Sequence, residues 1–120
     1  MPIKTGAELI AETKTRIREV SVEQVMKEIG TAGAPILLDC RERQETNLGR
    51  LPNAIVIPRG SLETKVEALI PREAYLVIYC QSGNRSAFAA ETLGKMGYEN
   101  VVSMAGGINA WAQSGGPIEN

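Results

Sequence analysis

Short apolar runs alternate with segments of helical periodicity along most of the chain. Four runs that are apolar or nearly so lie at 36–39, 54–57, 76–79 and 101–104. Runs of this length, rich in valine, isoleucine and leucine, are typical of strands buried on both faces of a parallel sheet. A shorter segment at 18–20 predicts one more, brief strand. The pattern therefore predicts about five strands.

The segments between these runs carry helix signals. Apolar positions recur at helical spacing within 5–17, which predicts a first helix. Ser21 followed by Gln24 is a capping-box pattern for a second helix, and Gly30 ends it. Further helices are expected at 43–48, 61–69, 86–96 and, after a Gly-Gly turn at 106–107, around Trp111.

Strands that alternate with helices indicate an α/β fold, with a small, mainly parallel sheet of about five strands and helices on both faces. We expect a single domain over 1–120, with 1–17 as an added N-terminal helical extension and 115–120 as a loose tail. In such a sheet, ligands bind beyond the carboxyl ends of the strands. Functional side chains are therefore expected where the apolar runs end.

Composition narrows the function further. Of the 120 residues, 43% are hydrophobic, which is enough to build one core. The 13 basic and 14 acidic residues leave a formal net charge of -1, so nucleic acid and anionic membranes are not expected as partners. Neither a membrane-spanning stretch nor a secretory signal pattern is visible in the sequence. Two cysteines do not make a disulfide framework, and we expect a reducing, cytoplasmic location.

The run at 76–79 leads into the segment with the clearest chemical character. It ends at Cys80, and a helical pattern begins at Ser86. The residues between them are mostly small or turn-prone and form a candidate anion-binding loop: Gln81, Ser82, Gly83, Asn84 and Arg85. Backbone N–H groups of such a loop can converge on one point, and the dipole of the following helix adds positive potential. A thiol held there is favoured as a thiolate, which predicts that Cys80 is a nucleophile and not merely a packed side chain.

The chain contains no histidine. This absence removes Cys/His and Ser/His/Asp catalysis, and it leaves too few soft ligands for a zinc site, so no metal is expected. Backbone amides and the helix start must then activate Cys80.

Four segments together resemble the single-domain rhodaneses, a family of sulfurtransferases. CQSGNRS at 80–86 resembles the active-site loop of that family, and LLDCRERQE at 37–45 resembles its Asp-x-Arg-Glu strand end. GRLPNAIVIPRGSLE at 49–63 is similar to the turn before the third strand, and MAGGINAW at 104–111 to the turn before the last helix. The resemblance runs from about Ser21 to the C-terminus. Two positions depart from it, because Cys40 stands where an aliphatic residue is common and Arg50 replaces the usual histidine of the turn.

The resemblance implies a rhodanese-like fold and the transfer of a sulfane sulfur through a persulfide on Cys80. The implied donor is a small sulfur anion, either thiosulfate or a persulfide. The implied acceptor is a thiol, on a small molecule or a protein, or cyanide in an assay. Such transfer needs little general-base help, because the thiolate is itself the attacking group, and it requires no cofactor.

Charged residues at the same predicted edge of the sheet are candidate supporting groups. Asp39 and Arg41 lie at the end of the second predicted strand, and Arg59 follows the third. We expect Asp39 to anchor loops, through backbone N–H groups or Arg85, and not to perform acid–base chemistry. Arg41 and Arg59 serve either the electrostatics of the site or the structure, and the sequence leaves both interpretations open.

Two further side chains allow more than one interpretation. Arg85 either binds the substrate anion or clamps the loop from outside. Cys40 is either a packing residue, the more common fate of such a cysteine, or a resolving thiol that turns an oxidised Cys80 into a disulfide.

Two other functions remain open at this stage. Cysteine-dependent phosphatases and arsenate reductases also place a cysteine in an anion-binding loop before a helix, but their arginine lies six residues after the cysteine. Here Arg85 lies five residues after Cys80, and a smaller loop suits a single sulfur better than a phosphoryl group. The second alternative is a regulatory rhodanese-like module that binds partners without turnover; such modules often lack the cysteine that this chain keeps.

Overall fold

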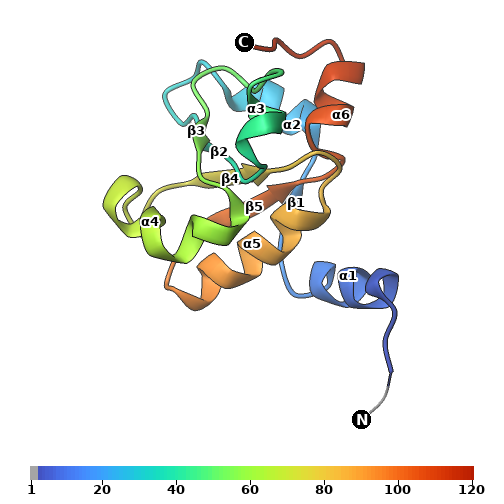
Figure 1. The fold of residues 1–120 in the computed structure, drawn as a ribbon. Helices are drawn as coiled ribbons and strands as arrows, with labels where there is room; N and C mark the ends of the chain where they lie inside the picture. The colour runs from blue at the N-terminus through green and yellow to red at the C-terminus, as the bar shows by residue number, and fades with distance from the viewer. Residues whose placement is uncertain (1–2) are drawn as a thin grey trace.

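A computed structural model describes residues 3–120 and has a five-stranded sheet at its centre, in which every strand pair is parallel (Figure 1). The strand order is β1-β5-β4-β2-β3. The strands are β1 (Glu19–Val20), β2 (Ile36–Asp39), β3 (Ile55–Val56), β4 (Leu76–Tyr79) and β5 (Val101–Met104). The α/β class and the number of strands predicted from the sequence are thus confirmed.

Helices cover both faces of the sheet, as predicted (Figure 1). α4 (Leu62–Leu69) and α5 (Asn84–Lys95) pack on one face, and α2 (Val22–Glu28) and α6 (Gly107–Gln113) pack on the other. α1 (Gly6–Lys14) lies against α5, while α3 (Arg43–Thr46) and the 3₁₀ helix η1 (Arg59–Ser61) belong to connections between strands and helices. No helix among the described residues is long and apolar enough to span a bilayer.

The central strand β4 explains why its apolar run is continuous. Leu76 and Ile78 point into the core formed with α4 and α5, whereas Val77 and Tyr79 point into the core formed with α2 and α6. All four side chains are fully buried. Because successive side chains in a strand face opposite sides, a strand covered on both faces must be apolar at every position.

Several boundaries differ from the sequence-based prediction. The first helix is shorter than 5–17, because Thr5 caps its start and the chain turns after Lys14. Ser61 stands at the N-cap position of α4, as predicted, but it also ends η1 and its side chain makes no capping bond. The strand predicted at 54–57 is reduced to β3, which lies at the edge of the sheet.

Residues 115–120, for which the sequence predicts a loose tail, are hydrogen-bonded to the body of the protein. The N–H of Arg50 donates to the carbonyl of Glu119 at 2.9 Å, and the N–H of Glu119 donates back at 2.8 Å. Trp111 Nε1 donates to the carbonyl of Pro117 at 2.8 Å. This segment therefore joins the connection before β3 to α6.

The strand order locates the functional edge. From β2 the chain goes outward to β3, and it then crosses back to β4 and continues toward β5 on the opposite side. Connections that leave neighbouring strands in opposite directions open a crevice beyond their carboxyl ends. Cys40 directly follows β2 and Cys80 directly follows β4, so both cysteines lie at this crevice.

Candidate functional site around Cys80

Cys80 lies between the end of β4 and the start of α5. The turn between them requires Gly83, whose φ of 98° is left-handed and is unfavourable for residues with a Cβ atom. α5 begins at Asn84, two residues earlier than predicted, so Asn84 and Arg85 belong to its first turn. The twelve-residue helix directs its positive dipole end toward the cysteine.

Two backbone N–H groups and one hydroxyl surround the sulfur of Cys80. The backbone N–H of Gly83 donates to Sγ at 3.2 Å, and the N–H of Ser86 donates at 3.4 Å. The hydroxyl oxygen of Ser86 lies 3.5 Å from Sγ and 2.8 Å from the hydroxyl oxygen of Ser103. Both serines are fully buried, so a hydroxyl chain from β5 supports the cysteine from inside the protein.

These neighbours make Cys80 more acidic than an ordinary cysteine. The adjacent thiol of Cys40, followed by the hydroxyl and N–H of Ser86 and the N–H of Gly83, lowers the pKa of Cys80 against the opposing effect of burial. The same contact with Cys80, together with burial, raises the pKa of Cys40. Of the two thiols, Cys80 is therefore the one that ionises.

The start of α6 fixes the back of the loop. The N–H groups of Ile108 and Asn109 donate to the carbonyls of Cys80 and Gln81 at 2.9 and 3.1 Å. Gly107, with a φ of 58°, lies so close that a Cβ atom there would come within 2.4 Å of the Cys80 carbonyl oxygen. Because the loop carbonyls bond outward to α6, the loop N–H groups are left to face the sulfur.

Arg85 links the loop to α3. Its two terminal nitrogens donate to the two carboxylate oxygens of Glu45, each at 2.7 Å. The Arg85 guanidinium lowers the pKa of Glu45 to about 2, so the pair stays charged in mildly acidic solution. In this conformation Arg85 clamps the loop from outside, which is one of the two roles that the sequence left open.

Asp39 and Arg41 form a buried pair beside the loop. Asp39 accepts the backbone N–H of Arg41 at 3.0 Å and two guanidinium nitrogens of the same residue. Of the two partners predicted for Asp39, the structure therefore has a backbone N–H and not Arg85, which pairs with Glu45. Arg41 also donates to the carbonyl of Gly49 at 2.7 Å and to Gln81 Oε1 at 3.1 Å.

Arg59 follows β3 as predicted, but its side chain contacts two helices and not the loop. Its guanidinium donates to the carboxylate of Glu63 in α4 and to the hydroxyl of Thr92 in α5, each at 3.1 Å. These contacts join two helices on one face of the sheet. Of the two arginines left open by the sequence, Arg41 is therefore the one that contacts the loop.

Four residues that position the loop escape sequence reasoning: Glu45, Ser86, Ser103 and Gly107. Ser86 stands in the loop motif, but nothing local indicates that its hydroxyl faces the cysteine. Ser103 is a polar residue within an otherwise apolar strand, and this contrast was the signal available for it. Glu45 and Gly107 act through contacts with segments distant in sequence, which no local pattern reveals.

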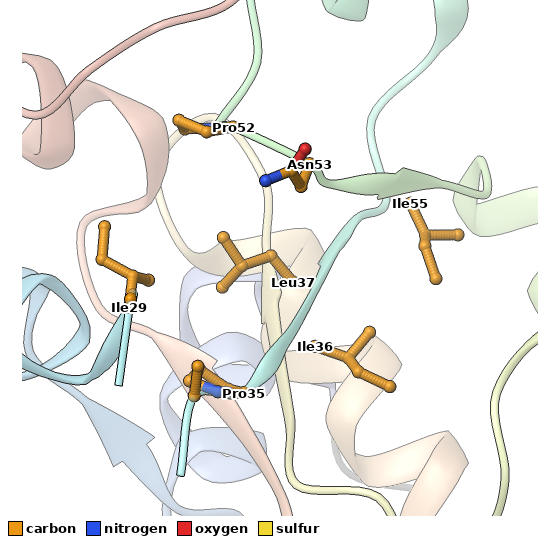
Figure 2. Close-up of a pocket in the computed structure, with 9 residues that line it drawn as sticks. Ile29, Pro35, Ile36, Leu37, Pro52, Asn53 and Ile55 are labelled. Carbon is orange, nitrogen blue, oxygen red and sulfur yellow. The ribbon is translucent and has the colours of Figure 1, made fainter. Parts of the chain in front are cut away.

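Two pockets bear on where a ligand could bind. One of about 270 Å³ opens beside the loop, between Arg41, Gln81, Asn109 and the exposed Leu48. A larger one of about 590 Å³ is lined mostly by hydrocarbon side chains, including Ile29, Leu37 and Pro52 (Figure 2). That larger pocket lies at the start of β2, the end opposite to Cys40, and is therefore remote from the sulfur of Cys80.

Comparisons with known proteins agree with this geometry. The model of the rhodanese-like domain family matches residues 21–114, which include every strand except β1. A protein named sulfurtransferase from Allochromatium vinosum is 33% identical over 102 residues, covering 85% of this chain and 94% of its own length.

Two further matches extend the comparison. The adenylyltransferase and sulfurtransferase uba4 from Ogataea parapolymorpha is 35% identical over 94 residues; these cover 78% of this chain but only 23% of that protein. A solved structure from Rhodopseudomonas palustris has a TM-score of 0.82 and 29% identity, and the match covers 99% of each chain. It is described as a protein of unknown function and possible tyrosine phosphatase.

Proposed function

The chain belongs to the family of rhodanese-like domains, and on that premise we propose that it is a sulfurtransferase that moves a sulfane sulfur through a persulfide on Cys80. The observation that carries the proposal is the position of Cys80 Sγ, within 3.2 and 3.4 Å of two backbone N–H groups at the start of α5. Donors so arranged stabilise a thiolate without a side-chain base. The chain has no histidine that could serve as one.

In the first step, the Cys80 thiolate attacks the outer sulfur of the donor. A bond forms between Sγ and that sulfur, while the bond to the rest of the donor breaks with its electron pair. Thiosulfate would release sulfite, and a persulfide would release a thiolate. The negative charge now lies on the outer sulfur of Cys80, and the N–H groups of the loop stabilise it there.

In the second step, a thiolate acceptor or cyanide attacks the outer sulfur. The sulfur–sulfur bond breaks, the acceptor leaves with the sulfur, and the Cys80 thiolate is regenerated. The low pKa of Cys80 favours this step too, because a more stable thiolate is a better leaving group. The acceptor is a thiol on a small molecule or a protein.

Charge around the loop favours a persulfide over thiosulfate as donor. Gln81 is uncharged, and the guanidinium groups of Arg41 and Arg85 are both engaged by carboxylates. A doubly charged anion such as thiosulfate would therefore gain little attraction at this site. We expect thiosulfate to be a weak donor and a persulfide a better one.

Free thiols at Cys40 and Cys80 suit a reducing compartment, so we propose that the protein is cytoplasmic.

The similarity to a possible tyrosine phosphatase makes phosphate transfer the main rival. A phosphatase of this type needs an arginine that faces the bound phosphoryl group. Here the arginine comes one residue early, and its guanidinium makes two 2.7 Å bonds to Glu45 outside the loop. Both features favour sulfur transfer.

An assay of the wild type and two variants tests the proposal. Thiocyanate formation from a sulfur donor and cyanide should be measured beside hydrolysis of an aryl phosphate. Cys80→Ser should lose thiocyanate formation, since an oxygen in place of sulfur is scarcely ionised near neutral pH and forms no persulfide. Cys40→Ser should still form a persulfide, because its hydroxyl can donate to Cys80 in place of the thiol. Full activity in Cys80→Ser, or faster turnover of the phosphate ester than of any sulfur donor, would overturn the proposal.

The same assay separates catalysis from binding alone. A regulatory module would give no thiocyanate and would not gain the mass of a sulfur atom when mixed with a donor. A catalytic protein should gain about 32 Da at Cys80, the mass of one sulfur.

A further inference from the structure

Cys40 and Cys80 occupy equivalent positions at the ends of two neighbouring strands. In the parallel pair β2–β4, Leu38 lies opposite Ile78 and Asp39 lies opposite Tyr79. The next residue in each chain segment is a cysteine. Adjacent strands lie about 4.7–4.9 Å apart, and disulfides span Cα separations of about 4.4–6.8 Å. The backbone therefore brings the two residues within the range of a disulfide.

Both thiols also point to the same side of the sheet. Strand side chains alternate between faces, and Cys40 shares its face with Leu38 just as Cys80 shares its face with Ile78. All four lie in the core formed with α4 and α5. Cys40 is 0% exposed and Cys80 is 1% exposed, and neither is oxidised to a disulfide.

The position of Cys40 is held by its backbone. Its N–H donates to the carbonyl of Tyr79 at 3.1 Å, and its carbonyl accepts the N–H of Arg59 at 3.0 Å. The mutual effect on acidity, which lowers the pKa of Cys80 and raises that of Cys40, agrees with this placement at neighbouring strand ends. Packing alone would not require a thiol here, because an apolar side chain of similar volume can fill a buried position equally well.

We propose that Cys40 is a resolving thiol, which converts the Cys80 persulfide into a Cys40–Cys80 disulfide and releases hydrosulfide when no acceptor is present. This inference rests on the proposed function, because it needs a persulfide on Cys80. The Cys40 sulfur attacks the inner sulfur, the sulfur–sulfur bond of the persulfide breaks, and its electron pair leaves on the outer sulfur. The proton of the Cys40 thiol goes to that outer sulfur, which departs as HS⁻. Cys40 is oxidised and the outer sulfur is reduced, so no external oxidant is needed.

Formation of the persulfide itself prepares Cys40 for this step. Contact with the Cys80 thiolate is the largest cause of the raised pKa of Cys40. Once the inner sulfur of Cys80 is bonded to a second sulfur, the negative charge lies on the outer sulfur, one atom farther along, so the direct effect of a charged inner sulfur on Cys40 is lost. Burial also shields the inner sulfur from external thiols, whereas Cys40 is already beside it. An acceptor competes with Cys40 because it removes the outer sulfur before Cys40 attacks the inner one. The supply of acceptor therefore decides whether the sulfur is transferred or released as hydrosulfide.

The test compares the reduced wild-type protein with Cys40→Val, which keeps an apolar side chain of similar size. Both are loaded with inorganic polysulfide under anaerobic conditions, freed of excess reagent, and followed by intact mass and by assay of released hydrosulfide. Wild type should gain about 32 Da, then lose it as one hydrosulfide per chain and finish about 2 Da lighter than the reduced protein. Cys40→Val should keep its added sulfur at least ten times longer. Peptide mapping of the wild type alone should find Cys40 joined to Cys80 within one chain.

Two results separate this inference from the proposed function. If wild type holds its added sulfur as long as Cys40→Val, or if the disulfide joins two chains, Cys40 is not a resolving thiol. Cyanide is added to loaded Cys40→Val as an independent arm. Failure of that variant to give thiocyanate would overturn the sulfurtransferase proposal, whatever happens to the wild-type disulfide.

Discussion

Removing the hydroxyl of Ser86 should raise the pKa of Cys80 and slow its reaction near neutral pH. Ser86→Ala deletes the oxygen that lies 3.5 Å from Sγ, while the N–H groups of Gly83 and Ser86 stay in place. The hydroxyl accepts a weak bond from the neutral thiol and donates to the ionised sulfur. Because a bond to a charged group is the stronger of the two, its loss destabilises the thiolate more than the thiol. The direction of the shift is therefore upward, toward the value of a free cysteine.

The magnitude follows from the bond that is lost. A hydrogen bond to a charged group contributes about 1.5–3 kcal/mol, and one pKa unit corresponds to about 1.4 kcal/mol. The contact between Ser86 and Cys80 is long, so the lower half of this range applies, and we expect a shift of about one unit. Stability should fall as well, by about 1–3 kcal/mol, because the buried hydroxyl of Ser103 loses its 2.8 Å partner.

The assay is alkylation by iodoacetamide as a function of pH, with the Cys80 peptide quantified by mass spectrometry so that Cys40 does not contribute. Ser82→Ala is the matched control, because it removes an exposed hydroxyl from the same loop. The double variant Ser86→Ala/Ser103→Ala separates the two effects. It should regain stability, since no unpaired hydroxyl remains, but the midpoint of its curve of alkylation against pH should stay raised.

Two outcomes would refute the reasoning. An unchanged midpoint in Ser86→Ala would mean that the hydroxyl does not stabilise the thiolate. An equal shift in Ser82→Ala would mean that the loop responds to any lost hydroxyl and not to the specific contact in the structure.

Three more predictions address the loop and the thiolate. Glu45→Gln should weaken the clamp on Arg85 and reduce thiocyanate formation. Because the pair is partly exposed, we expect the free energy of unfolding to fall by only roughly 0.5–1 kcal/mol. If neither the free energy of unfolding nor thiocyanate formation changed, Arg85 and Glu45 would not act as a clamp. Gly107→Ala should nearly abolish sulfur transfer, since its Cβ would collide with the Cys80 carbonyl. Gly30→Ala is the control, because Gly30 also has a left-handed φ but lies in open space; it should lose some stability and keep its sulfur transfer. Between about pH 6 and 8.5 the free energy of unfolding should rise with pH by at most about 1.4 kcal/mol per unit, because Cys80 binds a proton in the unfolded chain that it lacks when folded. Denaturant titrations across this range should show no such rise in Cys80→Ala.

Most of the fold could be predicted because its signals are local. The apolar runs that became β2, β4 and β5 are continuous in sequence, and their burial on both faces accounts for that continuity. Boundaries were less accurate where tertiary contacts decide them. α5 starts at Asn84 because Gly83 can adopt a left-handed conformation there, and the helical pattern alone had placed its start at Ser86.

The charged residues show where sequence reasoning stopped. Arg41 and Arg59 follow strands, Arg85 ends the cysteine loop, and the sequence left two roles open for each. In the structure each arginine pairs with a different carboxylate: Asp39 for Arg41, Glu63 for Arg59 and Glu45 for Arg85. Only the path of each long side chain through the folded protein distinguishes a clamp on the loop from a link between helices.

The sequence by itself determined that a cysteine stands between a buried strand and a helix, because strand, loop and helix are contiguous from Leu76 onward. Tertiary structure alone decided what surrounds that cysteine. Apolar runs of similar length do not specify their neighbours in a sheet, so the placement of β4 between β5 and β2 was open. That placement brings Ser103 to Ser86 from one side and Cys40 to Cys80 from the other. It thereby determines the acidity of Cys80 and places a second thiol beside it.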